Sequence, residues 1–400
     1  MIYKKIYFLL GVNKIMRKIA VVTGARSEYG LLKNTIKKIE ESENLILQLI
    51  VTGAHLSKKY GETVKEIEED NFNIEARIQI IDEELTSNNI CSEGAILLKE
   101  LGVTFKKLQP DLLLILGDRY EIFVAATAAM FLNIPICHIS GGEITEGAMD
   151  DKIRHSITKM ANIHFPGARE YARNIRKIGE EDWRIFNVGD PGIENIKETP
   201  MYNDEEIRNK IGWAIDEKTI VVTFHPVTLE IKNTKRYIDN LIFALKKFND
   251  SNIIITYPNS DEGSEIIIDA INKFESENSN VKVFKSLGIK LYLSVIKKCA
   301  VVVGNSSSGI VEAPYFKIPV VNIGNRQQGR LMAANIINCG YEKEEIYSSI
   351  EKALTSEFKE KVKKNTISLY GNGNSSEKIV EILEDIKIDD RLLKKKLIWN

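Results

Sequence analysis

Short apolar runs recur along this chain, and most of them end in a glycine or a polar turn before a helical pattern begins. These runs are KIAVVTG (18–24), LILQLIVTG (45–53), DLLLILGD (111–118), IPICHIS (134–140), RIFNVG (184–189), TIVVTFHP (219–226), NIIITYPN (252–259), VKVF (281–284), AVVVGN (300–305) and IPVVNIG (318–324). Runs that are apolar throughout, without alternation, indicate strands buried on both faces of a parallel sheet. Because strands and helices alternate in both halves, the sequence predicts an α/β protein with two doubly wound, Rossmann-like domains.

The two halves meet near residues 187–206, a stretch rich in Gly, Pro and acidic residues that contains no apolar run. This composition is typical of a linker. We therefore expect an N-terminal domain over residues 17–190 and a C-terminal domain over residues 191–371. Ligands of such sheets bind beyond the carboxyl ends of the strands. The loops after the strands are thus expected to carry the chemistry, in a cleft between two facing domains.

Length and composition agree with this organisation. A chain of 400 residues exceeds what one hydrophobic core usually serves. The formal net charge is −1 and the basic residues are dispersed, which argues against a nucleic-acid partner. The four cysteines are scattered without a CxxC pair, which favours reduced thiols in a cytoplasm and argues against a zinc site.

Residues 1–16 are expected to be an extension, either disordered or the product of an overlong start, because MRKIAVVTG from Met16 resembles a complete cytoplasmic start. A weak signal sequence is the alternative, but no Ala-x-Ala-like cleavage site follows. No apolar run approaches the length of about 20 residues that spans a bilayer, so we expect no membrane association.

The first candidate loop is TGARSEYG (23–30). Gly24 permits a tight turn, the following helix presents N–H groups to an anion, and the Arg26 guanidinium suits a phosphate. The alternative is a plain turn from strand to helix with a solvated Arg26. The loop lacks the GxGxxG pattern of dinucleotide-binding folds.

Two further loops favour anion binding in the second half. GNSSSGIVEA (304–313) places Ser306 and Ser307 where hydroxyls and N–H groups either cap a helix or hold phosphate oxygens, and no Walker lysine follows. GNRQQGR (324–330) carries Arg326 and Arg330, whose spacing is that of one helix face. Two such loops on adjacent strands suggest a diphosphate ligand, most simply a nucleotide.

Three remaining loops hold titratable side chains. His225 in FHPVT ends a strand beside Pro226, and Asp118 in LGDRYE follows a glycine, with Arg119 as a possible ion-pair partner. In HISGGEITEGAMDDKIRH (138–155), Asp150 and Arg154 are spaced to share a helix face, either as a surface salt bridge or as part of an acid–base site. Carboxylates crowded in a cleft have raised pKa values and serve as general acids or bases.

These loops together resemble the hydrolysing UDP-N-acetylglucosamine 2-epimerase family of sialic-acid-type and legionaminic-acid-type sugar synthesis. The resemblance spans residues 17 to 385 and rests on GARSEYG, GAHLSKKYG, GDRYE, SGGE…DDKIRHSITK, HPVT, YPNSDEGS, GNSSSGIVEA and GNRQQGR in that order. It implies a fold like that of GT-B glycosyltransferases, with a last helix near 372–390 crossing back to the first domain. It also implies chemistry that needs no cofactor and no metal.

The resemblance implies a two-step reaction. A base removes the proton at C2 of the sugar while UDP leaves from C1, and water then adds to the resulting glycal. The products are the free 2-epimer, N-acetylmannosamine in the case of UDP-GlcNAc, and UDP. The family motifs do not distinguish UDP-GlcNAc from a UDP- or GDP-linked diacetamido sugar.

The resemblance also implies residue roles. The catalytic residues would be Asp118, Asp150 and His225, with Arg154 positioning Asp150 or the sugar. The nucleotide would be held by Arg26, His225, Asn259, Ser306, Ser307, Gly309, Glu312 and Arg326. Weaker candidates for contact with the sugar are His55, Arg119 and Ser140.

One departure from the family concerns Ser140, since several relatives carry a catalytic Glu in its place. This chain has one additional residue between Glu143 and Asp150, so we hypothesise that Glu143 takes the missing role.

Three other functions stay open at this point. They are a non-hydrolysing epimerase, a GT-B glycosyltransferase and a nucleotide-sugar sensor without turnover. A homodimer or homotetramer is expected from the relatives.

Overall fold

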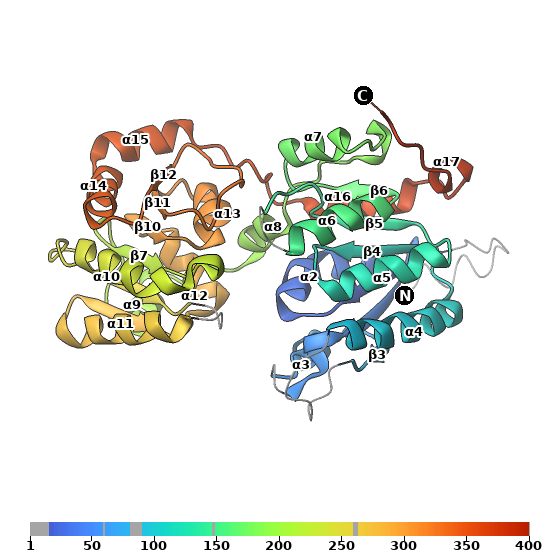
Figure 1. The fold of residues 1–400 in the computed structure, drawn as a ribbon, viewed down its shortest axis with the longest axis horizontal. Coiled ribbons are helices and arrows are strands. Elements are labelled where there is room, and N and C mark those ends of the chain that lie inside the picture. Colours follow the sequence, from blue (N-terminus) through green and yellow to red (C-terminus); the bar gives the residue numbers. More distant parts are fainter. Residues whose placement is uncertain (1–15, 59–60, 81–89, 146–148, 259–262, 400) are drawn as a thin grey trace. The chain divides into compact units, whose positions relative to one another are not determined.

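The computed structural model describes residues 16–58, 61–80, 90–145, 149–258 and 263–399 (Figure 1). The chain divides into two compact units. Unit 1 comprises Met1–Asn195 together with Gly371–Asn400, and unit 2 comprises Ile196–Tyr370. The chain therefore leaves unit 1 once and returns to it for its last thirty residues.

Unit 1 is built on a six-stranded parallel sheet in the order β3-β2-β1-β4-β5-β6. Its strands are β1 (Arg17–Thr23), β2 (Leu45–Thr52), β3 (Ile74–Ile78), β4 (Leu112–Leu116), β5 (Ile136–Ile139) and β6 (Ile163–Phe165). Its helices are α2 (Arg26–Glu41), η1 (Gly53–Leu56), α3 (Val64–Glu69), α4 (Ile90–Leu108), α5 (Tyr120–Phe131), α6 (Met149–Met160), α7 (Arg169–Lys177), η3 (Asp182–Arg184), α16 (Ser375–Asp385) and α17 (Asp390–Leu393). Helix α8 (Pro191–Glu198) spans the division between the units.

Unit 2 has a second six-stranded parallel sheet in the order β12-β11-β10-β7-β8-β9. Its strands are β7 (Ile220–Thr223), β8 (Ile253–Thr256), β9 (Val281–Phe284), β10 (Val301–Gly304), β11 (Val320–Ile323) and β12 (Ile336–Cys339). Its helices are α9 (Asp204–Ile211), η4 (Thr228–Asn233), α10 (Thr234–Leu245), α11 (Ser264–Glu277), α12 (Gly288–Ile296), α13 (Ser307–Tyr315), α14 (Lys343–Leu354) and α15 (Ser356–Asn365).

The two sheets have the same topology. In each, the first strand of the unit lies at the centre, and the order of the strands reverses there. The reversal falls between β1 and β4 in unit 1 and between β7 and β10 in unit 2. Ligands of doubly wound sheets bind at this reversal, beyond the carboxyl ends of the strands. The predicted class, two Rossmann-like doubly wound units, is confirmed.

Alternate residues of the central strands enter two separate cores. In β1, Ile19 and Val21 pack with α2 and α16, whereas Ala20 and Val22 pack with α4, α5 and α6. In unit 2, one face of the sheet is covered by α10, α11, α14 and α15, and the other by α9, α12 and α13. Burial on both faces explains why these strands appear as unbroken apolar runs.

The strand predictions need four corrections. The run 184–189 was predicted as a strand, but Arg184 ends η3 and only Ile185 forms an isolated bridge, to His164. Three strands at sheet edges were not predicted: β3, β6 and β12. Two of them, β3 and β12, are only partly buried, so their apolar pattern is weak.

The segment that returns to unit 1 is bound there through buried hydrogen bonds. Helix α16 packs on α2, and the buried Glu194 of α8 accepts hydrogen bonds from Ser375 Oγ (2.7 Å) and Ser376 N (2.8 Å). Within the described ranges, no helix combines the length and the apolar character needed to cross a bilayer.

Candidate functional site

In unit 1, the turn after β4 carries Asp118 and is held by a buried histidine. Gly117 has φ +81°, and His138 Nε2 donates a hydrogen bond to its carbonyl oxygen at 2.8 Å. His138 is fully buried, and burial lowers its pKa to about 3, so the ring is neutral. His138 therefore supports the turn that presents Asp118, a role that the sequence analysis missed.

The loop after β5 needs its two glycines because it lies close to neighbouring groups. A Cβ on Gly142, which has φ +81°, would lie 2.4 Å from the Tyr171 carbonyl oxygen. A Cβ on Gly141 would lie 3.1 Å from His138 Nδ1. Ser140 has φ +64°, a left-handed conformation that is uncommon outside glycine. The loop that starts at Ser140 is thus packed into unit 1.

Arg154 joins the loops after β4 and β5. Its buried guanidinium forms an ion pair with Asp118 and lies 3.5 Å from Asp151 Oδ1. It also donates to the Glu143 carbonyl oxygen at 3.0 Å and to Thr145 Oγ1 at 3.1 Å. One arginine therefore fixes the loop 143–145, the first turn of α6 and the turn after β4.

This arrangement corrects two expectations about ion pairs. Asp118 pairs with Arg154, whereas Arg119 pairs with Glu121 through both of its oxygens, at 2.9 and 3.2 Å. Arg154 is buried and does not form the surface salt bridge with Asp150 that its spacing allowed.

Asp150 lies exposed in the first turn of α6, one residue before Asp151. Partial burial raises its pKa, and the negative charge of Asp118 raises it further, while the positive charges of Arg154 and Arg119 oppose the rise. A carboxyl group with a raised pKa accepts and returns a proton near neutral pH more readily than an ordinary aspartate. The pKa of Asp150 is thus shifted in the direction that suits proton transfer, and the catalytic role of Asp150 stays a prediction.

Glu143 is half-buried in the loop that Arg154 holds, and Arg154 contacts its backbone carbonyl. Its carboxylate role in place of the glutamate that Ser140 lacks stays a prediction. Both residues lie in the loop that begins at the end of β5.

The loop after β1 differs from the expected anion site. Glu28 Oε2 accepts hydrogen bonds from the N–H groups of Gly24 (2.8 Å) and Ala25 (3.1 Å), so the carboxyl group of α2 itself occupies these two donors. Arg26 is 72% exposed and pairs with Glu66. The phosphate role of Arg26 stays a prediction.

Glu28 belongs to a buried group of charges at the base of this loop. Burial raises its pKa to about 8, the positive charge of Arg119 lowers it, and the negative charge of Glu121 raises it. Glu28 and Glu121 are 4% and 1% exposed. Gly24 fits this packing because a Cβ would lie in tight contact, 3.2 Å from Glu121 Cβ. Because Glu28 is protonated, the carboxyl groups of Glu28 and Glu121 together carry one negative charge beside Arg119.

His55 in η1, which follows β2, has both ring nitrogens engaged. It contacts Thr23 Oγ1 at 3.1 Å and Thr63 Oγ1 at 2.8 Å, and it is fully buried. Burial lowers its pKa to about 4. This geometry suits a support for the loops after β1 and β2 better than the predicted contact with a sugar.

Asn305 is the centre of the candidate site in unit 2. Its side chain accepts from His225 N at 2.7 Å and donates to His225 O at 2.8 Å, which joins the loops after β7 and β10. Its own carbonyl oxygen accepts from Arg326 at 3.1 Å and from Gln327 Nε2 at 2.9 Å. Three predicted loops thus meet at one fully buried residue, which the sequence analysis did not select.

His225 is mostly buried at the point where the strand order reverses. Burial lowers its pKa to about 4, and the positive charge of Arg326 contributes to the shift. A neutral imidazole beside an arginine can hydrogen-bond an anion without adding a second full charge. The two side chains are therefore suited to a diphosphate.

The serine loop forms the N-terminus of α13. The Ser306 side chain caps the helix by accepting from Ser308 N, and Ser307 is exposed in the first turn. Ser308 Oγ accepts a 2.7 Å hydrogen bond from the half-buried Tyr292, which the sequence analysis also missed. The exposed hydroxyl of Ser307 at the N-terminus of a helix favours an anionic ligand, although Ser308 N and Gly309 N already donate to Ser306.

Gly309 and Glu312 lie further along α13. A Cβ on Gly309 would lie 3.1 Å from Val320 Cγ1, so this glycine allows α13 to pack on β11. Glu312 is half-buried one turn later. The predicted contact of Glu312 with a ribose is untested, as is that of Asn259, which lies outside the described residues.

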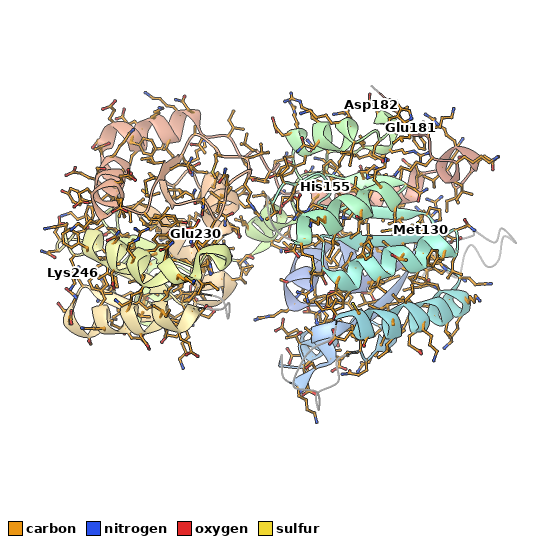
Figure 2. The ribbon with its side chains drawn as sticks, in the orientation of Figure 1. Met130, His155, Glu181, Asp182, Glu230 and Lys246 are labelled. Carbon is orange, nitrogen blue, oxygen red and sulfur yellow. The ribbon has the colours of Figure 1, made fainter. Side chains whose placement is uncertain are left out.

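The segment 324–330 is a series of turns and not the helix that its arginine spacing suggested. Gly324 has φ +73°, and a Cβ there would overlap the ring of Tyr341. Tyr341 stacks on Tyr237 with ring centroids 3.6 Å apart. Asn325 Nδ2 donates to Glu230 (labelled in Figure 2) at 2.9 Å, so the turn is held from several sides next to Arg326.

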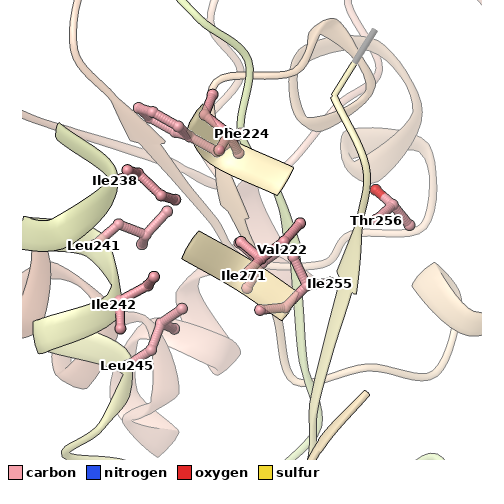
Figure 3. A pocket seen from close by; sticks show the side chains of 10 residues that line it. Val222, Phe224, Ile238, Leu241, Ile242, Leu245, Ile255, Thr256 and Ile271 are labelled. Carbon is pink, nitrogen blue, oxygen red and sulfur yellow. The ribbon is translucent and has the colours of Figure 1, made fainter. Parts of the chain in front are cut away.

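A small cavity lies in the interior of unit 2 and is not a ligand site. Its volume is about 10 Å³, and its lining is almost entirely apolar, from β7, β8, α10 and α11 (Figure 3). That space holds at most one water molecule. Within the described ranges, no group of three His, Cys, Asp or Glu side chains could hold a metal ion.

The chain also matches a model of a known protein family. A family model described as UDP-N-acetylglucosamine 2-epimerase matches residues 37–384. The chain belongs to this family. The resemblance inferred from its motifs is confirmed.

Two relatives of the family cover most of the chain. The GDP/UDP-N,N'-diacetylbacillosamine 2-epimerase (hydrolyzing) of Campylobacter jejuni is 38% identical over 345 residues, 86% of this chain and 89% of that protein. The UDP-N,N'-diacetylbacillosamine 2-epimerase (hydrolyzing) of Legionella pneumophila is 34% identical over 384 residues, 95% of this chain and 99% of that protein.

A solved structure supports the fold. The UDP-GlcNAc 2-epimerase of Neisseria meningitidis, bound to UDP-GlcNAc, matches with a TM-score of 0.77 at 18% identity, over 92% of this chain and 99% of that one. At 18% identity the similarity shows the fold alone, so the substrate has to be inferred from the residues of this chain.

Proposed function

We propose that this protein is a hydrolysing 2-epimerase of a nucleotide-linked 2-acetamido sugar, either UDP-GlcNAc or a UDP- or GDP-linked diacetamido analogue. The observation that carries the proposal is the Asp118–Arg154–Asp150 cluster beyond the strand ends of unit 1. Two hydrolysing 2-epimerases among the relatives support it.

In the first step, a carboxylate of this cluster takes the proton from C2 while the bond from C1 to the nucleoside diphosphate breaks. The electrons of the C2–H bond form the C1=C2 double bond of a glycal. We assign the proton transfer to Asp150, because its raised pKa makes it the better base. The ion pair between Asp118 and Arg154 holds the first turn of α6 in place and sets the net charge around it.

The leaving diphosphate is assigned to unit 2. Arg326 and the neutral His225 supply hydrogen-bond donors, and Ser306 and Ser307 supply hydroxyls at the N-terminus of α13. Donors placed where charge develops lower the barrier for departure. Arg26, Asn259 and Glu312 are assigned to the nucleotide on the family resemblance alone.

In the second step, water adds to the glycal. Hydroxide enters at C1 and a proton enters at C2 from the face opposite to the one it left, which inverts C2. Glu143 is our candidate for this proton, because a single carboxylate on one face does not deliver it to the other.

The test is turnover in deuterated water, followed by proton NMR, with UDP-GlcNAc and with UDP- and GDP-linked diacetamido sugars. We expect a free 2-epimer with deuterium at C2 and one nucleoside diphosphate per turnover. A UDP-linked epimer would instead indicate a non-hydrolysing epimerase. Transfer to an added acceptor would indicate a glycosyltransferase, and binding of all three sugars without turnover a sensor.

We further propose that the enzyme works in the cytoplasm as a homodimer or homotetramer. The four cysteines are free thiols, which fits a reducing compartment. Apolar side chains of the adjacent helices α4 and α5 are exposed, among them Val103 (61%) and Phe131 (66%). Size-exclusion chromatography with light scattering tests the assembly, and a monomer at micromolar concentration would contradict it.

A further inference from the structure

The last eleven described residues, 389–399, form a C-terminal tail that docks on unit 1. Asp389 caps α17, and Leu392 is fully buried. The buried Arg184 donates to the carbonyl oxygens of Leu392 (2.9 Å) and Arg391 (2.7 Å), and Asn162 Nδ2 donates to the former at 3.0 Å. The start of the tail is thus bound by side chains that the interior of unit 1 holds in place.

The end of the tail is bound as well. Ile398 N donates to Gly179 O at 2.9 Å, and Lys396 N donates to Glu181, labelled in Figure 2, at 3.4 Å. Gly179 has φ +91°, and a Cβ there would lie 2.6 Å from Leu397 Cδ1. Gly179 therefore leaves room for the tail. Lys395 lies between the two bound ends of the tail.

Lys395 is directed at the C-terminus of α6. Its ammonium lies within hydrogen-bond distance of the carbonyl oxygens of Thr158 (3.2 Å), Lys159 (2.8 Å) and Ala161 (2.7 Å). The last carbonyls of a helix have no partner within it and carry a partial negative charge, so a cation at this place stabilises the helix end. Lys395 thus adds a cation from the far end of the chain to Lys159, which lies in the last turn of α6 itself.

The same ammonium joins α6 to Glu180. Lys395 Nζ lies 2.7 Å from Glu180 Oε2, and Lys159 and His164 contact the same carboxylate at 2.5 and 3.1 Å. Burial opposes ionisation of Glu180, but hydrogen bonds from His164, Lys159 and Lys395 lower its pKa to about 2. Glu180 is therefore a buried anion, and without Lys395 it would lose one of its two lysine partners.

Helix α6 connects this group to the candidate catalytic residues. It is twelve residues long, with Asp150 and Asp151 in its first turn, Arg154 in its middle and the Lys395 contacts at its end. A helix of three turns moves largely as one body, so a loosened C-terminus displaces the carboxylates at its N-terminus. Displacements of about 1 Å far from the chemistry cost up to about 100-fold in rate.

We propose that Lys395 is a positioning residue for catalysis, because it fastens the C-terminus of α6 to Glu180 and thereby sets the place of Asp150 and Arg154. The inference rests on the proposed function. It extends the catalytic machinery to the C-terminal tail, which touches none of the reacting atoms.

The test compares Lys395→Met with Lys394→Met in the full chain. Lys394 is 75% exposed and, in the described part of the chain, pairs with Asp390 of the same tail, so its variant is the matched control. We expect kcat of Lys395→Met to fall about 10- to 100-fold with an unchanged KM, because unit 2 holds the nucleotide. Lys395→Arg should recover at least part of kcat, since a guanidinium also donates to carbonyls and a carboxylate.

Amide hydrogen exchange gives a readout that does not depend on turnover. Peptides covering 149–154 should exchange faster in Lys395→Met than in Lys394→Met. If the wild-type enzyme turns over none of the three sugars but this difference is present, the proposed function fails and the positioning of α6 stands.

A kcat of Lys395→Met within about twofold of the control, with equal exchange at 149–154, would overturn the inference. So would a purely structural effect, in which unfolding occurs at lower temperature but kcat per folded site is unchanged. Should Lys395→Met fail to fold, Lys395→Gln keeps part of the hydrogen bonding without the charge, and the same two readouts decide.

Discussion

The two units share one strand order and differ in what lies beyond the strand ends. In unit 1 the loops are joined by ion pairs, with Arg154 bound to Asp118 and Arg119 bound to Glu121. In unit 2 the loops are joined by an uncharged amide, Asn305, which pairs with both backbone groups of His225. The same fold thus carries a site rich in carboxylates in unit 1 and a site rich in uncharged hydrogen-bond donors in unit 2.

The difference follows from the tasks we assign to the units. Proton transfer needs carboxyl groups whose pKa values are shifted by their neighbours, and Asp150 and Glu28 are both shifted upward. Binding of an anion needs donors without competing carboxylates, and His225 is kept neutral. The comparison predicts that substitutions in unit 1 lower kcat, whereas substitutions in unit 2 weaken nucleotide binding.

The largest effect is expected from Asp118→Asn. It removes the negative charge that, after burial, raises the pKa of Asp150 and that pairs with Arg154, so kcat should fall about 10²- to 10⁴-fold. Affinity for UDP, measured by calorimetry, should stay unchanged because the nucleotide donors belong to unit 2. Asp250→Asn, on the surface of unit 2, is the control. A wild-type turnover rate in Asp118→Asn would show that this cluster takes no part in the reaction.

A smaller effect is expected from Asn305→Ala. The variant leaves the N–H and carbonyl groups of His225 without their buried partner, a loss of about 1 to 3 kcal/mol in loop order and stability. We expect UDP affinity to drop by about tenfold or more, since 1.4 kcal/mol corresponds to a factor of ten. Asn322→Ala, whose buried amide bonds to Asn338 on the edge strand, should lose stability but retain UDP affinity. Equal affinities in the two variants would contradict the role of Asn305.

The last prediction concerns stability against pH. Glu28 keeps its proton in the folded state up to a pKa of about 8, whereas the unfolded chain releases it near 4.5. Between these values the folded state binds more protons, so the free energy of unfolding should decrease as pH rises, by at most about 1.4 kcal/mol per pH unit.

Chemical denaturation of Glu28→Gln from pH 5 to pH 8 checks this sign. The variant should show a flatter dependence than the wild type, while Glu41→Gln, on the exposed face of α2, should not. An unchanged slope in Glu28→Gln would mean that Glu28 is ionised in the folded protein.

Much of the fold could be predicted from single residues and their neighbours. Nine of the predicted runs contain a strand of the structure, since a strand with both faces buried is mostly apolar. The edge strands β3 and β12 were missed because they are partly exposed. The strand predicted at 184–189 is absent, and Arg184 at its start is instead buried by hydrogen bonds to the tail. Hydrophobicity alone does not record such distant polar contacts.

The candidate site was predictable in its loops but not in its pairings. Sequence spacing suggested Arg119 for Asp118 and Asp150 for Arg154, because these are neighbours along the chain or along a helix. The structure instead joins Asp118 to Arg154, 36 residues away, and leaves Arg119 with the buried Glu121. Asn305, His138 and Lys395 gave no local signal, since their partners lie on other strands or helices.

The sequence by itself determined the two doubly wound units, the family and the loops that hold the candidate chemistry, because these depend on local burial patterns and short motifs. Only the tertiary structure decided which charges pair, which carboxyl groups have raised pKa values and which residue closes α6. Those properties depend on the distance and dielectric surroundings of groups far apart in the chain, and only the packed structure sets them.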